Sequence, residues 1–168
     1  ALATSAPDVQ VVVNNGGILR GSPLLEPAAI KNFKTELEVN TFGWLRVAQT
    51  LAPVIESNGG GAMVQLNSVA SIKNFADFTT YCASKSASYS ITQGLKDVLE
   101  PKGIQVLSVH PGPIATDMAV EAGFGDMGDS VSTVSEGIVA ALKSGDFHLF
   151  PDTMAQQVAQ AYDGFRTN

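Results

Sequence analysis

The residues with the clearest chemical potential are a tyrosine and a lysine four positions apart, in the segment Tyr81-Cys-Ala-Ser-Lys85. If this segment is helical, both side chains emerge on one face, within reach of each other. A free phenol titrates near pH ~10, but a fixed ammonium neighbour stabilises the phenolate, and lowering the pKa by two or three units requires only about 3 to 4 kcal/mol. We therefore expect an acid/base pair in which Lys85 lowers the pKa of Tyr81. Taken alone, the spacing fits an ordinary exposed helix pair better than a catalytic one.

The surroundings of this pair make the acid/base interpretation more specific. Apolar, β-branched runs predict strands at residues 8–13, 62–67 and 104–110, and a shorter run predicts a strand at 147–150. The first three runs end in polar or turn-forming segments, namely Asn14-Asn15-Gly16-Gly17, Asn67-Ser68 and Pro111-Gly112. Ligands bind at the carboxyl ends of the strands in an open parallel sheet, so these loops and the start of the Tyr81 helix are expected to share one crevice.

Helical patterns alternate with the predicted strands. They cover residues 27–57, with an interruption near Asn40, and residues 81–99; two more helices are expected from Ser132 or Thr133 to residue 143 and from Thr153 to residue 165. Alternating strands and helices of this length indicate a Rossmann-like, doubly wound parallel α/β sheet of about four strands with flanking helices. We expect residues 1–168 to form a single domain.

Composition excludes several classes of partner. The net charge is −6 and no run of Lys or Arg occurs, which argues against binding to nucleic acid or to an anionic membrane surface. The single cysteine, Cys82, cannot form an internal disulfide, and no secretion signal or apolar run of about 20 residues is present, so a cytoplasmic location is expected. His110 and His148 have no carboxylate or cysteine at ligand spacing, so no metal site is expected.

Taken together and in order, these motifs resemble the classical short-chain dehydrogenase/reductase family along essentially the whole chain. The Asn-Asn-Gly-Gly loop looks like the Asn-Asn-Ala-Gly loop of that family, with Gly16 in place of alanine. Glu38-Val-Asn40 looks like its helix-borne asparagine. Its catalytic serine, tyrosine and lysine are matched by Ser68, Tyr81 and Lys85, and its nicotinamide-holding segment is matched by Pro111, Gly112 and Thr116.

The resemblance implies a role for each matched residue and NAD or NADP as the cofactor. Tyr81 would exchange a proton with the oxygen of a small-molecule carbonyl or alcohol substrate, Ser68 would hold that oxygen, and Lys85 would lower the tyrosine pKa and bind the nicotinamide ribose. Asn40 would anchor a water that connects Lys85 to solvent. The remaining cofactor contacts would come from Asn14 and Gly16 on the adenosine side, and from Pro111, Gly112, Ile114 and Thr116 around the nicotinamide and pyrophosphate.

Two further expectations follow from the resemblance. A substrate loop would occupy about residues 117–131, where Glu121 to Asp129 has neither helical nor strand periodicity. A homo-oligomer, either a dimer or a tetramer, is also implied, because in the family the helices that correspond to those of Trp44 and Tyr81 commonly pack against a second subunit.

The chain departs from the family at its beginning, because the glycine-rich turn that cradles the pyrophosphate is not found in these 168 residues. If nothing else covers it, the strand near Asp8 would form an exposed sheet edge at which the chain would dimerise. Two alternative functions therefore stay open. The chain could be a catalytically silent, folded and oligomeric scaffold, or it could use the same tyrosine and lysine for epimerisation or dehydration.

Overall fold

The computed structural model of the chain describes residues 2–123 and 128–166. Its centre is a sheet of four parallel strands, in which each strand lies beside the next one in the chain. The predicted parallel α/β fold and its four strands are therefore confirmed, although the first strand begins three residues later than expected. The strands are β1 (Val11–Asn14), β2 (Gly61–Leu66), β3 (Ile104–Val109) and β4 (His148–Leu149).

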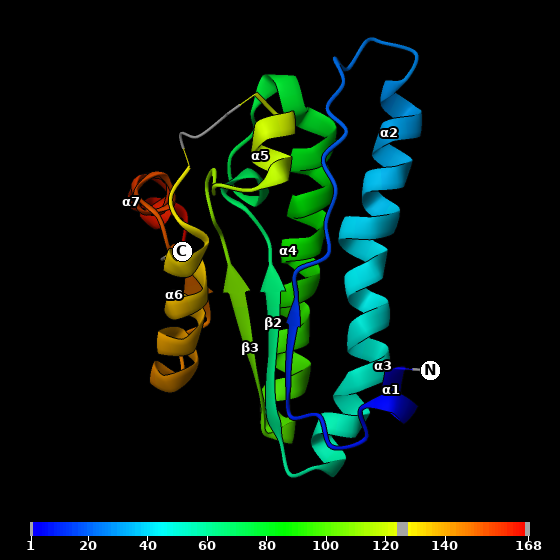
Figure 1. The fold of residues 1–168 in the computed structure, drawn as a ribbon, viewed down its shortest axis with the longest axis vertical. Coiled ribbons are helices and arrows are strands. Elements are labelled where there is room, and N and C mark those ends of the chain that lie inside the picture. Colours follow the sequence, from blue (N-terminus) through cyan, green and yellow to red (C-terminus); the bar gives the residue numbers. More distant parts are fainter. Residues whose placement is uncertain (1, 124–127, 167–168) are drawn as a thin grey trace.

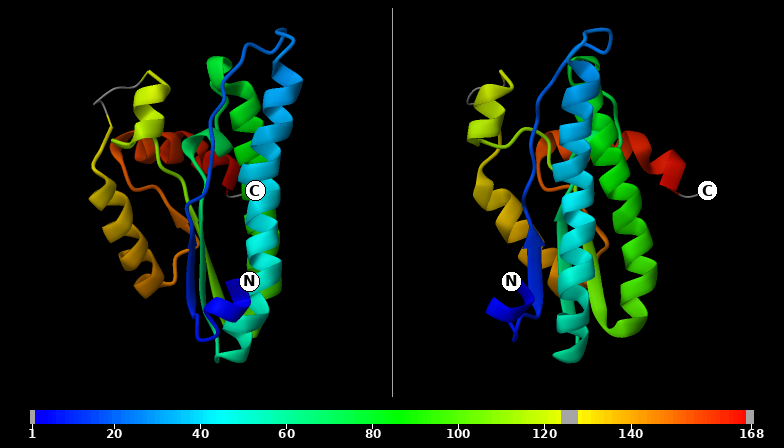
Figure 2. Two further views of the ribbon diagram at one scale, coloured as in Figure 1. Left: turned by 45° about the vertical axis from the view of Figure 1, so that its right-hand side comes forward. Right: turned by 90° about the vertical axis from the view of Figure 1, so that its right-hand side faces the viewer.

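Helices cover both faces of the sheet (Figures 1 and 2). On one face, α2 and α3 form a long column beside α4, and the predicted interruption near Asn40 is a π-helical stretch between α2 and α3. The opposite face carries α6. The helices are α1 (Leu2–Ser5), α2 (Ala29–Glu36), the π-helix (Leu37–Phe42), α3 (Gly43–Ser57), α4 (Thr79–Leu99), α5 (Asp117–Glu121), α6 (Val131–Ser144) and α7 (Thr153–Arg166), with short 3-10 turns at Val69–Ser71, Ala76–Phe78 and Glu100–Lys102.

Alternate residues of the two central strands pack into separate apolar cores. Met63 and Val106 belong to the core beneath α3 and α4, whereas Val64 and Leu107 belong to the core beneath α6. Successive side chains of a strand point to opposite faces, so most positions of a strand that is covered on both faces have to be apolar. The buried polar exceptions, Gln65 and Ser108, are hydrogen-bonded. This requirement explains the near-continuous apolar runs in the sequence.

Two helices begin with a different capping residue from the one predicted. Ser130, rather than Ser132 or Thr133, caps α6, and its Oγ atom accepts a hydrogen bond from the backbone N–H of Ser132 at 3.2 Å. Thr153 is the first residue of α7, but the acceptor is the carboxylate of Asp152, which receives the N–H of Ala155 at 2.9 Å. In both cases the cap is the residue before the helix, from which a side chain can turn back to the free N–H groups of the first turn.

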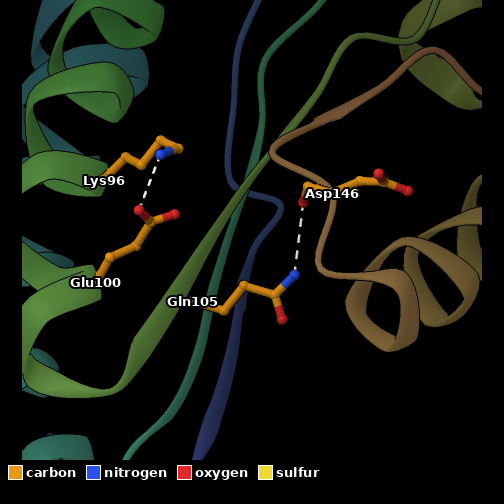
Figure 3. Close-up of polar contacts among 4 residues, drawn as sticks. All are labelled: Lys96, Glu100, Gln105 and Asp146. Atoms are coloured by element: carbon orange, nitrogen blue, oxygen red, sulfur yellow. Dashed lines mark hydrogen bonds and ion pairs between the residues drawn. The ribbon is translucent and has the colours of Figure 1, made fainter.

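The carboxyl ends of the strands, the start of α4 and the short helix α5 lie at the same end of the molecule (Figure 1). The opposite end of α4 carries an ion pair between Lys96 and Glu100 at 2.8 Å (Figure 3). Near it, the side chain of Gln105 on β3 donates to the backbone carbonyl of Asp146 at 3.5 Å, and thereby connects β3 to the turn after α6 (Figure 3). These contacts lie away from the crevice and stabilise the scaffold.

Strand β1 is the edge of the described sheet, because among the described strands it pairs only with β2. Val12 packs into the core beneath α3, whereas Val11 and Val13 point to the other face and are 52% and 48% exposed. The edge thus presents both free backbone groups and apolar side chains. Within the described residues, no helix is long and apolar enough to cross a membrane.

Candidate active site

Tyr81 and Lys85 lie one turn apart near the start of α4, and both are buried in the wall of the crevice. The Nζ atom of Lys85 donates a hydrogen bond to the carbonyl oxygen of Leu66, at the carboxyl end of β2, at 2.8 Å. The same atom lies 5.8 Å from the centroid of the Tyr81 ring. The two side chains are therefore neighbours, as the spacing predicts, and the bond to Leu66 fixes where the ammonium group sits.

The pKa values of this pair differ from the expectation. Burial raises the pKa of Tyr81 to about 12; a hydrogen bond with Ser68 acts in the opposite direction, whereas the nearby Cys82 and Glu36 raise the pKa further. Burial also lowers the pKa of Lys85 to about 8. At neutral pH Lys85 is therefore mostly protonated, whereas Tyr81 is a neutral phenol. Desolvation is the largest influence on the Tyr81 pKa and Lys85 is not among its causes, so the lowering of that pKa by Lys85 stays a prediction.

Ser68 lies directly after β2 and caps the 3-10 turn Val69–Ser71. Its Oγ atom accepts the backbone N–H of Ala70 at 3.1 Å and donates to the carbonyl of Pro111 at 3.3 Å. The hydroxyl also interacts with the phenol of Tyr81, whose pKa it lowers. Ser68 and Tyr81, thirteen residues apart in the sequence, are therefore brought together as predicted.

A buried histidine supports the loop that carries Ser68. The Nδ1 atom of His110 lies 2.9 Å from the Ser71 hydroxyl and 3.3 Å from the Ser68 carbonyl, and its Nε2 atom lies 2.8 Å from the Ser108 hydroxyl. The Ser71 hydroxyl itself donates to the Ser68 carbonyl at 2.5 Å. The position of His110 beneath Ser68 indicates a structural role.

Asn40 is fully buried in the π-helix and lies beside Lys85. Its side chain accepts the N–H of Ile18 at 2.8 Å and donates to the Ile18 carbonyl and to the Ser84 hydroxyl, both at 2.9 Å. A Cβ atom on Gly17 would lie 3.4 Å from the Asn40 Oδ1 atom and 3.3 Å from the Lys85 Nζ atom. The asparagine side chain therefore holds the loop after β1 against Lys85.

A cavity with a volume of about 780 Å³ occupies this end of the sheet, and Ser68, Tyr81 and Lys85 line it. The loop after β1 contributes Asn15 and Gly17, rather than Asn14 and Gly16 as expected. The Asn14 side chain instead donates to the Gln65 side chain at 2.6 Å. A Cβ atom on Gly16 would meet no other atom within 4 Å. The expected contacts of Asn14 and Gly16 with the adenosine side of the cofactor stay a prediction.

The segment after β3 lines the same cavity through Pro111, Gly112, Ile114 and Thr116, as predicted. The N–H of Gly112 donates to the Asp152 carboxylate at 2.7 Å, and a Cβ atom on Gly112 would lie only 2.7 Å from the other carboxylate oxygen. Glycine is therefore required for this close approach. The sequence analysis missed Asp152; an aspartate directly before a helical pattern was the available signal.

The comparison with protein families agrees with this geometry. Residues 2–124 match the family model for short chain dehydrogenases. The chain belongs to the short-chain dehydrogenase family. Within the described part of this dehydrogenase chain, no group of three or more His, Cys, Asp or Glu side chains could hold a metal ion.

Known members of the family resemble parts of this chain closely. The chain is 32% identical over 109 residues to the 7alpha-hydroxysteroid dehydrogenase of Escherichia coli (strain K12), covering 65% of this chain and 42% of that enzyme. It is 28% identical over 120 residues to the serine 3-dehydrogenase of Agrobacterium fabrum (strain C58), covering 71% of this chain and 48% of that enzyme. The chain thus spans less than half the length of these two curated relatives.

Solved structures of short-chain dehydrogenases confirm the fold. A short-chain dehydrogenase from Burkholderia cenocepacia J2315, crystallised in complex with NADP, has a TM-score of 0.90 and 31% identity to this chain; the match covers 99% of this chain and 69% of that one. A short-chain dehydrogenase from Sphingobium yanoikuyae in complex with NADPH has a TM-score of 0.79 and 22% identity, with 97% of this chain and 68% of that chain covered. The second likeness shows the fold alone.

Proposed function

We propose that this chain supplies the catalytic side of an NAD(P)-dependent oxidoreductase that interconverts a carbonyl compound and a secondary alcohol. The observation that carries the proposal is the joint position of Tyr81, Ser68 and Lys85 in the wall of one cavity at the carboxyl ends of three parallel strands. A phenol, a hydroxyl and an amine in this arrangement can hold a substrate oxygen and exchange a proton with it.

The residues around the cavity fit the nicotinamide half of a dinucleotide. Gly17 lines the cavity on the β1 side, and Gly112, Ile114 and Thr116 line it after β3. The proposed contacts of Pro111, Gly112, Ile114 and Thr116 with the nicotinamide and pyrophosphate depend on this position. Asn15 and Gly17 are better placed than Asn14 and Gly16 for the contacts on the β1 side. When bound, the nicotinamide would give or accept a hydride at the substrate carbon.

In the direction of reduction, Tyr81 would donate its phenolic proton to the substrate oxygen as the carbonyl π bond breaks and the hydride adds to the carbon. A pKa of about 12 keeps the phenol protonated at neutral pH, which suits a proton donor. Ser68 would donate a hydrogen bond to the same oxygen as negative charge develops there. Lys85, with a pKa of about 8, is able to return a proton to the phenolate near neutral pH, and a water held near Asn40 would resupply Lys85.

Three further features belong to the same proposal, namely the substrate loop, the oligomeric state and the class of substrate. Residues 117–131 would form the substrate loop; α5 lies in this segment, and Met118, Ala119 and Ala122 line the cavity. Residues 124–127 of that loop lie outside the described residues. The chain would act as a single domain in a homo-oligomer, and its substrate would be a small molecule, as the names of the steroid and serine dehydrogenases indicate for those relatives.

The test is a fluorescence titration of NADH and of NADPH into the 168-residue chain, followed by assays with carbonyl compounds. Saturable binding and substrate-dependent oxidation of the reduced cofactor, both in the wild-type chain, are the expected results. The Tyr81→Phe variant should bind the cofactor equally well but fail to turn over the substrate. A folded chain that binds neither cofactor would contradict the proposal and favour the silent scaffold.

A further inference from the structure

A second cavity adjoins the catalytic one. It has a volume of about 480 Å³ and shares Leu19, Phe78, Met118 and Ala122 with the larger cavity. The four shared residues place the two cavities next to each other, so a ligand that passes these residues would reach from Tyr81 into the second space. We call this second space the outer cavity. Its volume lies within the range of about 300–1,000 Å³ that is typical of pockets for drug-sized molecules.

The surroundings of Tyr81 on this side are apolar. Tyr81, Ala70 and Cys82 form a buried cluster, and Leu19, Phe75 and Phe78 pack against it. Five of these residues, including both phenylalanines, also line the catalytic cavity. A substrate whose oxygen lies at Tyr81 and Ser68 therefore has its neighbouring atoms against aromatic and aliphatic side chains.

Charged side chains are distributed unevenly between the two cavities. Among the described residues that line the catalytic cavity, Lys85 is the one charged side chain, and it is bound to the Leu66 carbonyl. The outer cavity is lined by Arg20, Asp77 and Glu121. Polar and charged groups of a ligand are therefore accommodated away from the reacting atoms, at the far end of the combined space.

We infer that the site takes bulky, apolar ketones and secondary alcohols, with an uncharged body against Leu19, Phe78 and Met118, and that it discriminates against small oxo acids and hydroxy acids. This inference rests on the proposed function. In a small acid the carboxylate lies only a few bonds from the reacting carbon. It would be buried against apolar side chains without a partner, which is costly in free energy. A larger molecule fills the apolar wall and places any polar group in the outer cavity.

The experiment compares two probes of opposite character, decalone and acetoacetate, by calorimetric titration into the full chain saturated with NADH or NADPH, or into the chain alone if neither cofactor binds. We expect decalone to bind at least about tenfold more tightly, because desolvation of an unpaired carboxylate exceeds the roughly 1.4 kcal/mol that corresponds to a factor of ten. Turnover of each probe is measured in parallel.

Two lysine substitutions on the same short helix separate the cavity wall from general charge effects. Met118→Lys places a cation in the wall that the two cavities share, whereas Val120→Lys places one on a side chain that is 59% exposed and lines neither cavity. Met118→Lys is expected to weaken decalone binding and to strengthen acetoacetate binding, so that the preference falls by about tenfold or more. Val120→Lys is expected to leave both affinities unchanged.

The outcomes distinguish this inference from the proposed function. Preferential decalone binding without turnover supports the inference and counts against the proposed chemistry. Turnover that favours acetoacetate supports the chemistry and overturns the inference. Equal affinity for both probes, no binding of either, or a preference that Met118→Lys and Val120→Lys change to the same extent would also overturn it.

Discussion

The Nζ atom of Lys85 lies 5.8 Å from the centroid of the Tyr81 ring, and the lysine nevertheless loses its proton at a lower pH than the tyrosine. Both groups are buried, and burial favours the neutral form of each, so it lowers the pKa of the amine and raises that of the phenol. The pair in this chain is therefore mostly uncharged above pH ~8. A positively charged nicotinamide next to Tyr81 would favour the phenolate, which is the form needed to accept a proton from an alcohol.

The lowered pKa of Lys85 predicts a specific dependence of stability on pH. Between about pH 8 and 10.5 the unfolded chain keeps the lysine protonated while the folded chain does not, so the free energy of unfolding should rise with pH. The rise should be about 3 kcal/mol, since each unit of pKa corresponds to about 1.4 kcal/mol. Denaturant unfolding at a series of pH values should show this rise in the wild-type chain but not in Lys85→Met. Parallel curves for the two proteins would mean that the Lys85 pKa is normal.

Tyr81→Phe should lower kcat by about 10² to 10⁴-fold, because it removes the proposed proton donor and keeps the ring. Cofactor affinity should change little. Tyr162→Phe is the matched control, because it makes the same change on α7, away from the described cavities. The raised pKa can be checked with the same variants: the absorbance of the phenolate that is lost in Tyr81→Phe should appear near pH 12 in the wild-type chain. Unchanged turnover in Tyr81→Phe would remove Tyr81 from the mechanism.

The sequence predicted the elements of this fold well, because their physical signals are local. Most positions of a parallel strand that is covered on both faces have to be apolar, and β2 and β3 follow that rule apart from Gln65, Gln105 and Ser108. The shared location of Ser68, Tyr81 and Lys85 was also predictable, since the carboxyl ends of the three strands must meet at one edge of a parallel sheet.

The features of the site that could not be predicted from the sequence depend on contacts between distant segments. The role of Asp152 requires Gly112, which is forty residues away, to approach within hydrogen-bonding distance. The presence of Asn15 rather than Asn14 in the cavity wall depends on the bond that Asn14 makes with Gln65. The pKa values depend on how much protein covers Tyr81 and Lys85, and a spacing of four residues contains no information about burial.

Replacement by alanine should have opposite effects on stability at two glycines near the cavity. Gly112→Ala should destabilise the chain by about 1 to 3 kcal/mol, because the new Cβ atom would lie 2.7 Å from an Asp152 oxygen that is fixed by the N–H of Ala155. Gly16→Ala should be neutral or stabilising by up to about 1 kcal/mol, since its Cβ atom meets nothing and its φ is not positive. Thermal unfolding of both variants decides the matter, and a loss in Gly16→Ala as large as that in Gly112→Ala would contradict the prediction.

His110→Phe should lower stability by about 1 to 3 kcal/mol, because the hydroxyls of Ser71 and Ser108 lose their buried partner. It should also lower kcat while the affinity for cofactor stays constant, since the loop that carries Ser68 would shift. His148→Phe is the control: it removes a ring nitrogen that lies 2.7 Å from the Tyr89 hydroxyl but touches neither Ser68 nor Ser71 in the described contacts. An equal loss of kcat in both variants would show that the position of Ser68 does not depend on His110 in particular.

The exposed edge at β1 predicts self-association of the 168-residue chain. Val11 and Val13 are about half exposed, and the outer backbone groups of β1 have no strand partner among the described strands. An uncharged, apolar edge of this kind pairs readily with a second copy, and lysines on an edge strand oppose such pairing. Analytical ultracentrifugation should therefore show a dimer for the wild-type chain and a shift towards monomer for the double variant Val11→Lys and Val13→Lys. Val139→Lys, on the exposed side of α6, should leave the dimer intact. A compact wild-type monomer would show that this edge does not mediate association.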